Sequence, residues 1–498
     1  MTGLMERERT ATPVAPVRHR GRTAACVAAF SVLLLTPCFW QQRIQAGDLS
    51  SHIYNAWLAQ LIEHGRAPGL TLAKQYNNIL FDWMLSGLMS TFGPGPAQRI
   101  AVSAAVLVFF WGAFAFVWSR SRRREAPWQL APLLAMLAYG WVFRMGFFNF
   151  HLSFGLCLGA LALVQHRKAW RIGAAVLLCG VGYVAHPLPL AWAIGVLAYE
   201  RIAEALAPRR RLWLAFGALA VLVLAVFLVG RQFVTRRDPG QLMCLTGADQ
   251  LWIYGRGYIA FSVALLSTWA LCFERVLNTG GVWRTILRPP FQLCGLTAAT
   301  VALLPGAVLL PGYSHQIAFL AQRLSLASAL LFCAVVASVR LPKPLVGAMA
   351  VMALLFFGMS YLDERSLNRL ETRIERAVAQ LPPGQRVVSA LADPESRIPD
   401  VHAIDRVCVG RCYSYGNYEP SSGQFRVRAD VVNAFVVADY ADSWNIQTGS
   451  YVVQPRDLPL YNVSLCTPGS TRMCVWDLHA GAKVSSSTIR VLWEVGKG

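Results

Sequence analysis

One acidic residue and one histidine stand four positions apart where the chain leaves its first apolar segment. Asp48 and His52 belong to the stretch GDLSSHIYNAWLAQLIEHGRAPGL, residues 47–70. Its apolar residues recur at helical spacing until Gly65 and Pro68, which predicts a short amphipathic helix at a membrane surface. Residues four apart share one face of a helix, so the carboxylate and the imidazole are expected to act together. A carboxylate within reach of a hydroxyl group has the chemistry of a general base.

Asp48 also has a simpler interpretation. It would stand at the N-cap of the predicted helix, where Asp is a preferred residue because its carboxylate accepts free backbone N–H groups. The local pattern alone favours this cap over a catalytic acid. The two roles are compatible, and the direction of the carboxylate distinguishes them.

The composition predicts an α-helical polytopic membrane protein. Of the 498 residues, 55% are hydrophobic and 14% are charged, and the apolar residues gather in long runs. The net charge of +20 comes mainly from Lys and Arg in short loops between these runs, where such residues set orientation, so nucleic acid is not an expected partner. The first run follows an arginine-rich arm and no cleavage signal follows it, which predicts a retained anchor.

Basic loops and apolar runs together predict about 11 transmembrane helices. Residues 1–23 would form a cytoplasmic basic arm, residues 24–361 the transmembrane domain, and residues 41–99 an outer loop that carries Asp48. Residues 362–498 would form a small extracytoplasmic α/β domain, with strands in RVVSAL, NAFVVADY, YVVQ and TIRVLWEV. The predicted spans are residues 24–40, 100–118, two within 128–164, a hairpin within 172–199, 212–230, 257–273, 291–310, 317–339 and 345–361.

Four cysteines of the C-terminal region bear on this sidedness. They are Cys408, Cys412, Cys466 and Cys474. An even number on an oxidising side suits two disulfides. Four cysteines also suit zinc, but their spacing lacks a C-x2-C pair, so disulfides are the favoured prediction and no metal ligand is assigned.

Polar residues predicted at the same outer surface complete a candidate substrate-binding site. They are Arg237, Arg256, Arg323, His186, His315 and Asn149. Guanidinium groups at this depth suit a phosphate or pyrophosphate, because their forked donors match its oxygens. Binding of lipid headgroups is the alternative for each arginine, and ordinary hydrogen bonding explains an isolated histidine near a span end.

The assembled pattern resembles the GT-C superfamily, the polytopic glycosyltransferases that use polyprenyl-phosphate sugars on the non-cytoplasmic face. The resemblance rests on the first span, the outer loop opening with GDLSSH, the many later spans and the outer C-terminal domain. In that family an acidic residue early in the first outer loop is the catalytic base, and Asp48 matches it. Many members have a second acid beside it, whereas Leu49 follows here, so a divalent cation is left open as a cofactor. The D-x-x-x-H form is similar to that of bacterial membrane proteins of the same broad group.

The resemblance implies a hexosyl or pentosyl transferase of the bacterial inner membrane. A polyprenyl-phosphate-linked sugar would be the donor, a lipid or glycan the acceptor, and membrane lipid would hold the donor's tail. Asp48 would be the base, His52 would orient it or the acceptor, and the outer arginines would hold phosphate. A polymerase or ligase of lipid-linked glycans is a second interpretation. A non-enzymatic sensor or transporter is a third, although few charges lie within the spans.

Overall fold

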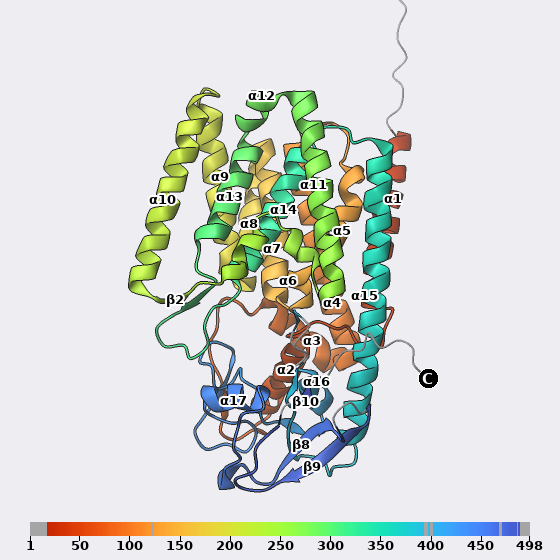
Figure 1. The fold of residues 1–498 in the computed structure, drawn as a ribbon, viewed down its shortest axis with the longest axis vertical. Helices are drawn as coiled ribbons and strands as arrows, with labels where there is room; N and C mark the ends of the chain where they lie inside the picture. The colour runs from red at the N-terminus through yellow and green to blue at the C-terminus, as the bar shows by residue number, and fades with distance from the viewer. Residues whose placement is uncertain are drawn as a thin grey trace, which may run out of the picture.

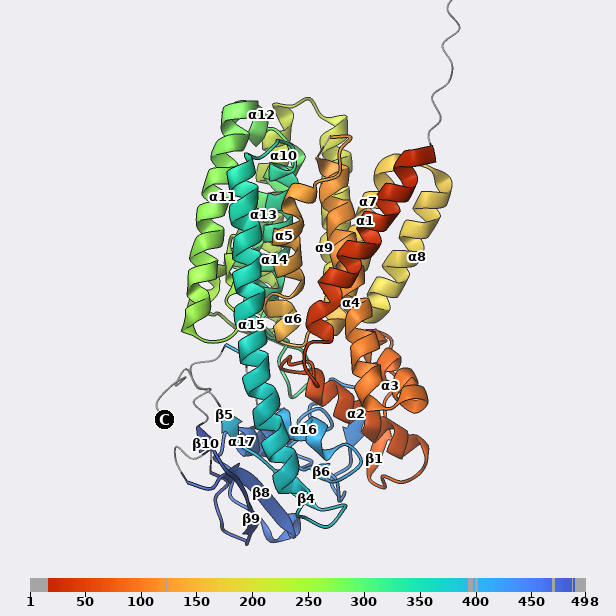
Figure 2. The same cartoon turned by 90° about the vertical axis from the view of Figure 1, so that its right-hand side faces the viewer.

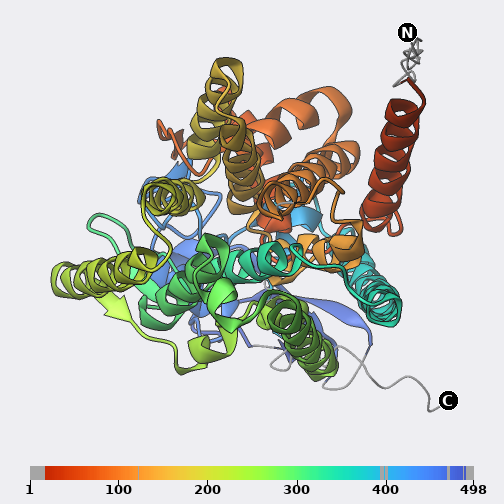
Figure 3. The same ribbon diagram turned by 90° about the horizontal axis from the view of Figure 1, so that it is seen from above.

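The protein consists of a layer of long helices with a smaller group of helices and strands at one end (Figure 1). The computed structural model describes residues 17–121, 123–392, 397–398, 402–467, 471–485 and 487–488. Residues 1–16 of the predicted basic arm therefore lie outside the described residues. Figure 3 looks along the long helices and places α1, in red, at the edge of the layer.

Each apolar run predicted as a span coincides with a helix. These helices are α1 (Val17–Leu35), α4 (Pro94–Arg120), α5 (Ala131–Ala138), α7 (Phe148–Leu163), α8 (Ala169–Ala185), α9 (Pro187–Ala205), α10 (Arg210–Gln232), α11 (Ile259–Gly280), α13 (Pro289–Leu303), α14 (Leu320–Val336) and α15 (Lys343–Val378). Within the described part of the chain, five helical segments are long and apolar enough to cross a membrane, and they contain α4, α7, α10, α11 and α15. The fold is therefore that expected of a helical membrane protein.

The segments predicted as outer loops come together at one end of the helical layer. Shorter elements there include α2 (Leu49–Glu63), α3 (Leu80–Phe92) and α6 (Trp141–Arg144). β2 (Val234–Arg236) pairs there with β3 (Ala307–Leu309) in an antiparallel arrangement. The short helix α12 (Val282–Ile286) lies at the opposite end (Figures 1 and 2).

The C-terminal region contains a four-stranded sheet in the order β6-β4-β8-β9. β4 is parallel to β6 and β8, and β8 is antiparallel to β9. A separate strand pair joins β1 of the outer loop to β7, and β5 pairs with β10. The bounds are β1 (Leu70–Leu72), β4 (Arg386–Val388), β5 (Leu391–Ala392), β6 (Tyr413–Ser414), β7 (Val427–Ala429), β8 (Leu460–Leu465), β9 (Met473–Leu478), β10 (Ser487–Thr488), α16 (Ala403–Cys408) and α17 (Tyr440–Gln447).

The predicted strands of this region are only partly correct. β4 falls within RVVSAL and β5 begins at its last residue, but the stretch NAFVVADY, residues 433–440, forms no strand. The Asn433 side chain accepts hydrogen bonds from the backbone N–H groups of Phe435 and Val436, and Asp439 caps α17. Turn chemistry of Asn and Asp therefore overrides the β propensity of the valines between them. YVVQ forms an isolated bridge at Val452, and most of TIRVLWEV lies outside the described residues.

The C-terminal region shares its hydrophobic core with the membrane-proximal helices. Tyr54 and Leu58 of α2 and Ile374 of α15 are buried against Val387 and Val463 of the sheet. α15 itself is one continuous helix of 36 residues that passes Tyr361, where the sequence places a domain boundary (Figure 2). This continuous helix and shared core hold the C-terminal region against the start of α2.

Candidate active site

The turn between α6 and α7 fixes the backbone of Asp48. The Asp48 N–H group donates to the Met145 carbonyl at 2.9 Å, and the Gly47 N–H group donates to the Arg144 carbonyl at 2.7 Å. Gly146 has a φ of +88°, and a Cβ atom there would lie 2.6 Å from the Asp48 nitrogen. Glycine at 146 is therefore required both by its backbone conformation and by the close approach of Asp48.

A buried ion pair anchors this turn to α15. Arg144 and Glu364 meet at 2.6 Å, and each side chain is only 1% exposed. Arg144 also donates to the Ser360 hydroxyl at 2.6 Å and to the Gln45 carbonyl at 3.0 Å. The ion pair thus links α6, α15 and the segment at Gln45 around Asp48, the residue before α2.

The carboxylate of Asp48 does not cap α2. Asp48 occupies the N-cap position, but its side chain accepts no hydrogen bond from the helix, so the capping interpretation is wrong for this side chain. The carboxylate is 22% exposed, and its Oδ1 atom lies 3.8 Å from Nε2 of His402. Burial raises the pKa of Asp48, against the lowering effect of the charges on His402, His52 and Arg323. A carboxylate with a raised pKa is a better proton acceptor than an ordinary surface Asp.

His402 is oriented by a chain of hydrogen bonds that begins in α16. Its Nδ1 atom lies 2.9 Å from Oδ2 of Asp405, and Oδ1 of Asp405 accepts a hydrogen bond from the Ser414 hydroxyl. The Ser414 N–H group donates to the Tyr54 hydroxyl of α2 at 2.9 Å. Burial alone would lower the pKa of His402, but the hydrogen bond and charge of Asp405 outweigh it and raise this pKa.

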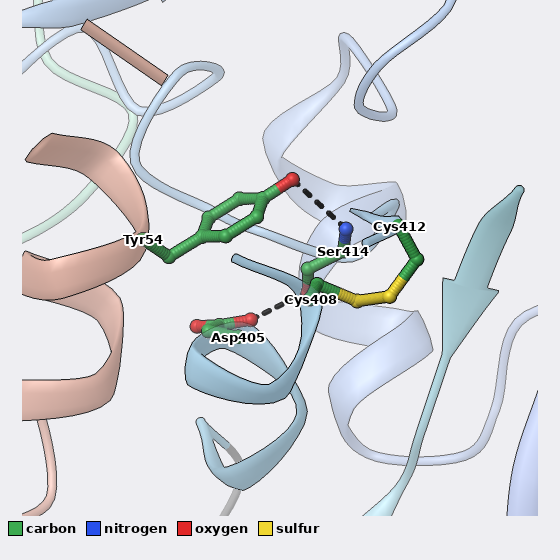
Figure 4. The surroundings of a disulfide bond; sticks show 5 residues. All are labelled: Tyr54, Asp405, Cys408, Cys412 and Ser414. Carbon is green, nitrogen blue, oxygen red and sulfur yellow. Dashed lines mark hydrogen bonds between the residues drawn. A yellow bond between two sulfur atoms is a disulfide. The ribbon is translucent and has the colours of Figure 1, made fainter. Parts of the chain in front are cut away.

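A disulfide closes the element that carries this chain. Figure 4 shows the Cys408–Cys412 bond beside Asp405 and Ser414, with Tyr54 reaching across from α2. The bond joins the end of α16 to the residue before β6. A second disulfide, Cys466–Cys474, links β8 and β9. The four cysteines form two disulfides as predicted, and the structure supplies their pairing, so the zinc alternative is wrong.

His52 is oriented by α3 rather than by Asp48. Its Nδ1 atom lies 2.7 Å from Oδ1 of Asp82, and Oδ2 of Asp82 accepts a hydrogen bond from the Asn149 amide at 2.9 Å. Burial alone would lower the pKa of His52, but the charge and hydrogen bond of Asp82 raise it to about 9. Asn149 also accepts a hydrogen bond from the Phe81 N–H group. Its amide thus holds the start of α3, which is an alternative to its predicted role in substrate binding.

Two neighbouring residues of the C-terminal region, Tyr418 and Glu419, complete the site. Glu419 is buried, accepts a hydrogen bond from the Ser51 hydroxyl at 2.8 Å, and has a pKa raised to about 7 by burial. The Tyr418 ring lies 5.4 Å from the His402 ring and 5.3 Å from the His315 ring, measured between centroids. Tyr418 thus lies between His402, which is beside Asp48, and the predicted residue His315.

Arg323 is a half-buried cation without an oxygen partner among the described residues. Its Nη1 atom lies 3.3 Å from Nε2 of His186, and its guanidinium carbon lies 3.9 Å from the centroid of the Phe147 ring. Nδ1 of His186 accepts a hydrogen bond from the Leu188 N–H group, so in the neutral ring Nε2 carries the proton. Nε2 then has no lone pair for Arg323, and Nε of Arg323 is itself buried without a partner. The donors of Arg323 are therefore free for an anion.

The other two predicted arginines are not brought to this site. Arg237 follows β2, and Arg256 begins a short helical turn before α11. Both side chains are exposed, and neither forms a hydrogen bond or an ion pair with another described residue. The structure thus groups Asp48, His52, His186, His315 and Arg323, and leaves Arg237 and Arg256 at the surface.

The described residues contain no cluster of side chains suited to a metal ion. In that part of the chain no group of three or more His, Cys, Asp or Glu side chains could hold one. Asp48 and Glu419 are instead surrounded by histidines and hydroxyl groups.

Sequence reasoning missed the contribution of the C-terminal region. His402 and Asp405 lie about 350 residues after Asp48 in the chain, and no local motif connects them. Tyr418 and Glu419 stand in the stretch GRCYSYGNYEPSSGQFRVRA, whose polar and aromatic residues near a cysteine pair were the available signal. Asp82 was also visible, because it interrupts an otherwise apolar run.

No protein-family model matches the chain, and no curated protein or solved structure matches it either.

Proposed function

We propose that the protein is a membrane glycosyltransferase of the GT-C type, with Asp48 as the general base. It would move a sugar from a polyprenyl-phosphate donor to a lipid or glycan acceptor. The proposal rests on one observation, which is that the Asp48 carboxylate and the Arg323 cation are close enough for their charges to interact. The charge of Arg323 acts on the carboxylate of Asp48, and neither group is neutralised by a direct salt bridge with the other.

The two groups suit opposite ends of one displacement reaction. An acceptor hydroxyl attacks C1 of the sugar, and its proton passes to the Asp48 carboxylate as the new C1–O bond forms. The bond from C1 to the phosphate oxygen breaks, and its electron pair stays on that oxygen. Arg323 donates N–H groups to the developing phosphate charge, which is the state in which its donors find an acceptor.

Neighbouring residues position Asp48 and tune its pKa. His402 stands 3.8 Å from the carboxylate and is itself held by Asp405. The charge of His402 lowers the pKa of Asp48 from the value that burial alone would give. Because burial still raises this pKa, the carboxylate is a stronger proton acceptor than an exposed one.

The arrangement of the chain supports an extracytoplasmic site in the bacterial inner membrane. In the proposed topology the N-terminus is cytoplasmic, about 11 helices cross the membrane, and residues 362–498 lie outside. Two features support this. The disulfides lie at the same end as Asp48, and the loop after α4 carries Arg123 and Arg124 at the other end.

The decisive experiment measures sugar transfer by the full-length protein in membrane vesicles. Radiolabelled polyprenyl-phosphate hexoses and pentoses serve as donors, and the labelled product is identified. Asp48→Asn should lower the rate by roughly 10²- to 10⁴-fold, because a general base contributes about that much. Asp430→Asn is the matched control, since Asp430 is exposed at the same end and should leave the rate unchanged. Equal rates for Asp48→Asn and wild type would refute the assignment of the base.

A further inference from the structure

A groove lies at the opposite end of the helical layer from Asp48. It has a volume of about 670 Å³ and lies between α4, α7 and α8. This volume falls within the range of roughly 300–1,000 Å³ that is typical of small-molecule sites. The proposed transfer reaction uses none of its residues.

The inner part of the groove is apolar and follows the helices toward mid-membrane. Its wall contains Val108 and Gly112 of α4, Gly155 and Gly159 of α7, and Leu178 of α8. A Cβ atom on Gly112 would lie 2.1 Å from the Gly155 carbonyl oxygen, so the two helices touch along this line. The groove passes beside this contact and is open at Gly159, where an added Cβ atom would meet only Leu178 Cδ1, at 3.7 Å. Its elongated apolar wall is a suitable shape for a hydrocarbon chain.

The mouth of the groove is cationic. Arg124, Arg171 and His166 line it where α4 and α7 end and α8 begins. Neither arginine forms an ion pair with a described carboxylate, and Nε of Arg171 is buried without a hydrogen-bond partner.

Some other arginines at this end have acidic partners. Arg120 pairs with Glu200 at 2.8 Å, and Arg123 pairs with Glu125 at 2.6 Å. Arg124 and Arg171 thus keep their positive charge unneutralised at the mouth of an apolar groove.

We propose that this groove binds an anionic diacyl phospholipid of the leaflet opposite the Asp48 site. One acyl chain lies against Gly155 and Gly159, and the phosphate lies between Arg124 and Arg171. Guanidinium donors match phosphate oxygens, and basic residues near a membrane surface attract anionic lipids. The order of the lining residues, from apolar at mid-membrane to cationic at the helix ends, matches the order of groups in a phospholipid.

The charge component is tested by native mass spectrometry of the full-length protein in detergent. Phosphatidylglycerol and phosphatidylcholine with the same acyl chains are titrated separately. The wild type should bind phosphatidylglycerol at least tenfold more tightly, and Arg124→Gln with Arg171→Gln should remove this preference. Arg209→Gln with Arg210→Gln is the control, because these exposed arginines lie at the same end and outside the groove.

The groove component is tested by filling it. A Cβ atom on Gly159 meets only Leu178 Cδ1, at 3.7 Å, so Gly159→Leu fits the backbone and places its side chain in the groove. This variant should lose phosphatidylglycerol binding by about tenfold, whereas Gly173→Leu, on the exposed side of α8, should bind as wild type does. Equal binding of the two lipids would overturn the proposal. Tighter binding of a polyprenyl monophosphate than of phosphatidylglycerol would also overturn it. So would wild-type binding of phosphatidylglycerol by both the double arginine variant and Gly159→Leu.

Discussion

At the scale of single residues, Arg323 distinguishes this site from an ordinary buried ion pair. Its guanidinium faces an imidazole nitrogen and an aromatic ring, and its charge acts on Asp48 without contact. A cation that is partly removed from water is costly to hold without an anionic partner, so a site that retains one is suited to an anionic ligand.

We therefore expect Arg323→Gln to lower kcat/KM for sugar transfer by roughly 10- to 100-fold, which corresponds to the loss of charged hydrogen bonds. Arg323→Lys should recover part of this loss, because a point charge replaces the fork. Arg237→Gln is the matched control and should stay within about twofold, since Arg237 is exposed away from Asp48. Steady-state kinetics with a fixed acceptor measure all three variants. An equal loss in Arg237→Gln would show that surface charge, rather than the site, attracts the donor.

His402 sets the pH dependence of the same carboxylate. Its positive charge lowers the pKa of Asp48, so His402→Gln should raise that pKa. Transfer requires ionised Asp48, and the acid limb of kcat/KM against pH should therefore move to higher pH in His402→Gln. His479→Gln is a control, because His479 lies after β9 and is not part of the site. An acid limb that stays in place would exclude His402 as a neighbour that tunes the base.

At the scale of elements, the α6–α7 turn determines where Asp48 stands. Gly146→Ala should lower stability by roughly 1–2 kcal/mol through its positive φ, and it should also displace the Asp48 backbone through the clash at 2.6 Å. Gly65→Ala provides the comparison, because Gly65 has a φ of +68° and nothing within 4 Å of an added Cβ.

Both alanine variants should unfold at lower temperature than wild type, and only Gly146→Ala should lose transfer activity. Thermal unfolding and initial rates separate the two effects. Similar activity losses in both variants would point to general destabilisation instead of displacement of Asp48.

The two disulfides offer a second comparison at this scale. Their loops are short, with sequence separations of 4 and 8, so each bond should contribute about 2–3 kcal/mol by the chain-entropy estimate. Replacing Cys408 and Cys412 by Ser should also loosen Asp405 and thus His402, and so shift the acid limb of the pH profile. Replacing Cys466 and Cys474 should change stability alone. Identical pH profiles for the two double variants would contradict a positioning role for the first disulfide.

At the scale of the whole molecule, the sequence predicts the helical membrane class and the positions of the apolar helices, but the site only in part. Of the 11 predicted spans, five correspond to helical segments of the described chain that are long and apolar enough to cross a membrane. Long apolar runs coincide with helices because each run determines its own local structure, and the cysteine pairs formed the expected disulfides. The partners of Asp48 were not predictable in this way. His402 reaches Asp48, and Glu419 reaches Ser51, through packing of distant segments. Sidedness alone grouped Arg237 with Arg323.

The unbroken length of α15 has a geometrical consequence for this packing. A helix of 36 residues is about 54 Å long, which exceeds the ~30 Å hydrocarbon core of a bilayer. This helix joins the layer of long helices to the C-terminal region, which contains His402. One residue inserted near Tyr361 would move the part of α15 beyond it by about 1.5 Å along the helix axis and rotate that part by about 100°. The number of residues in α15 thus determines how the C-terminal region is oriented relative to Asp48. Lengthening the helix by one residue would turn His402 away from Asp48.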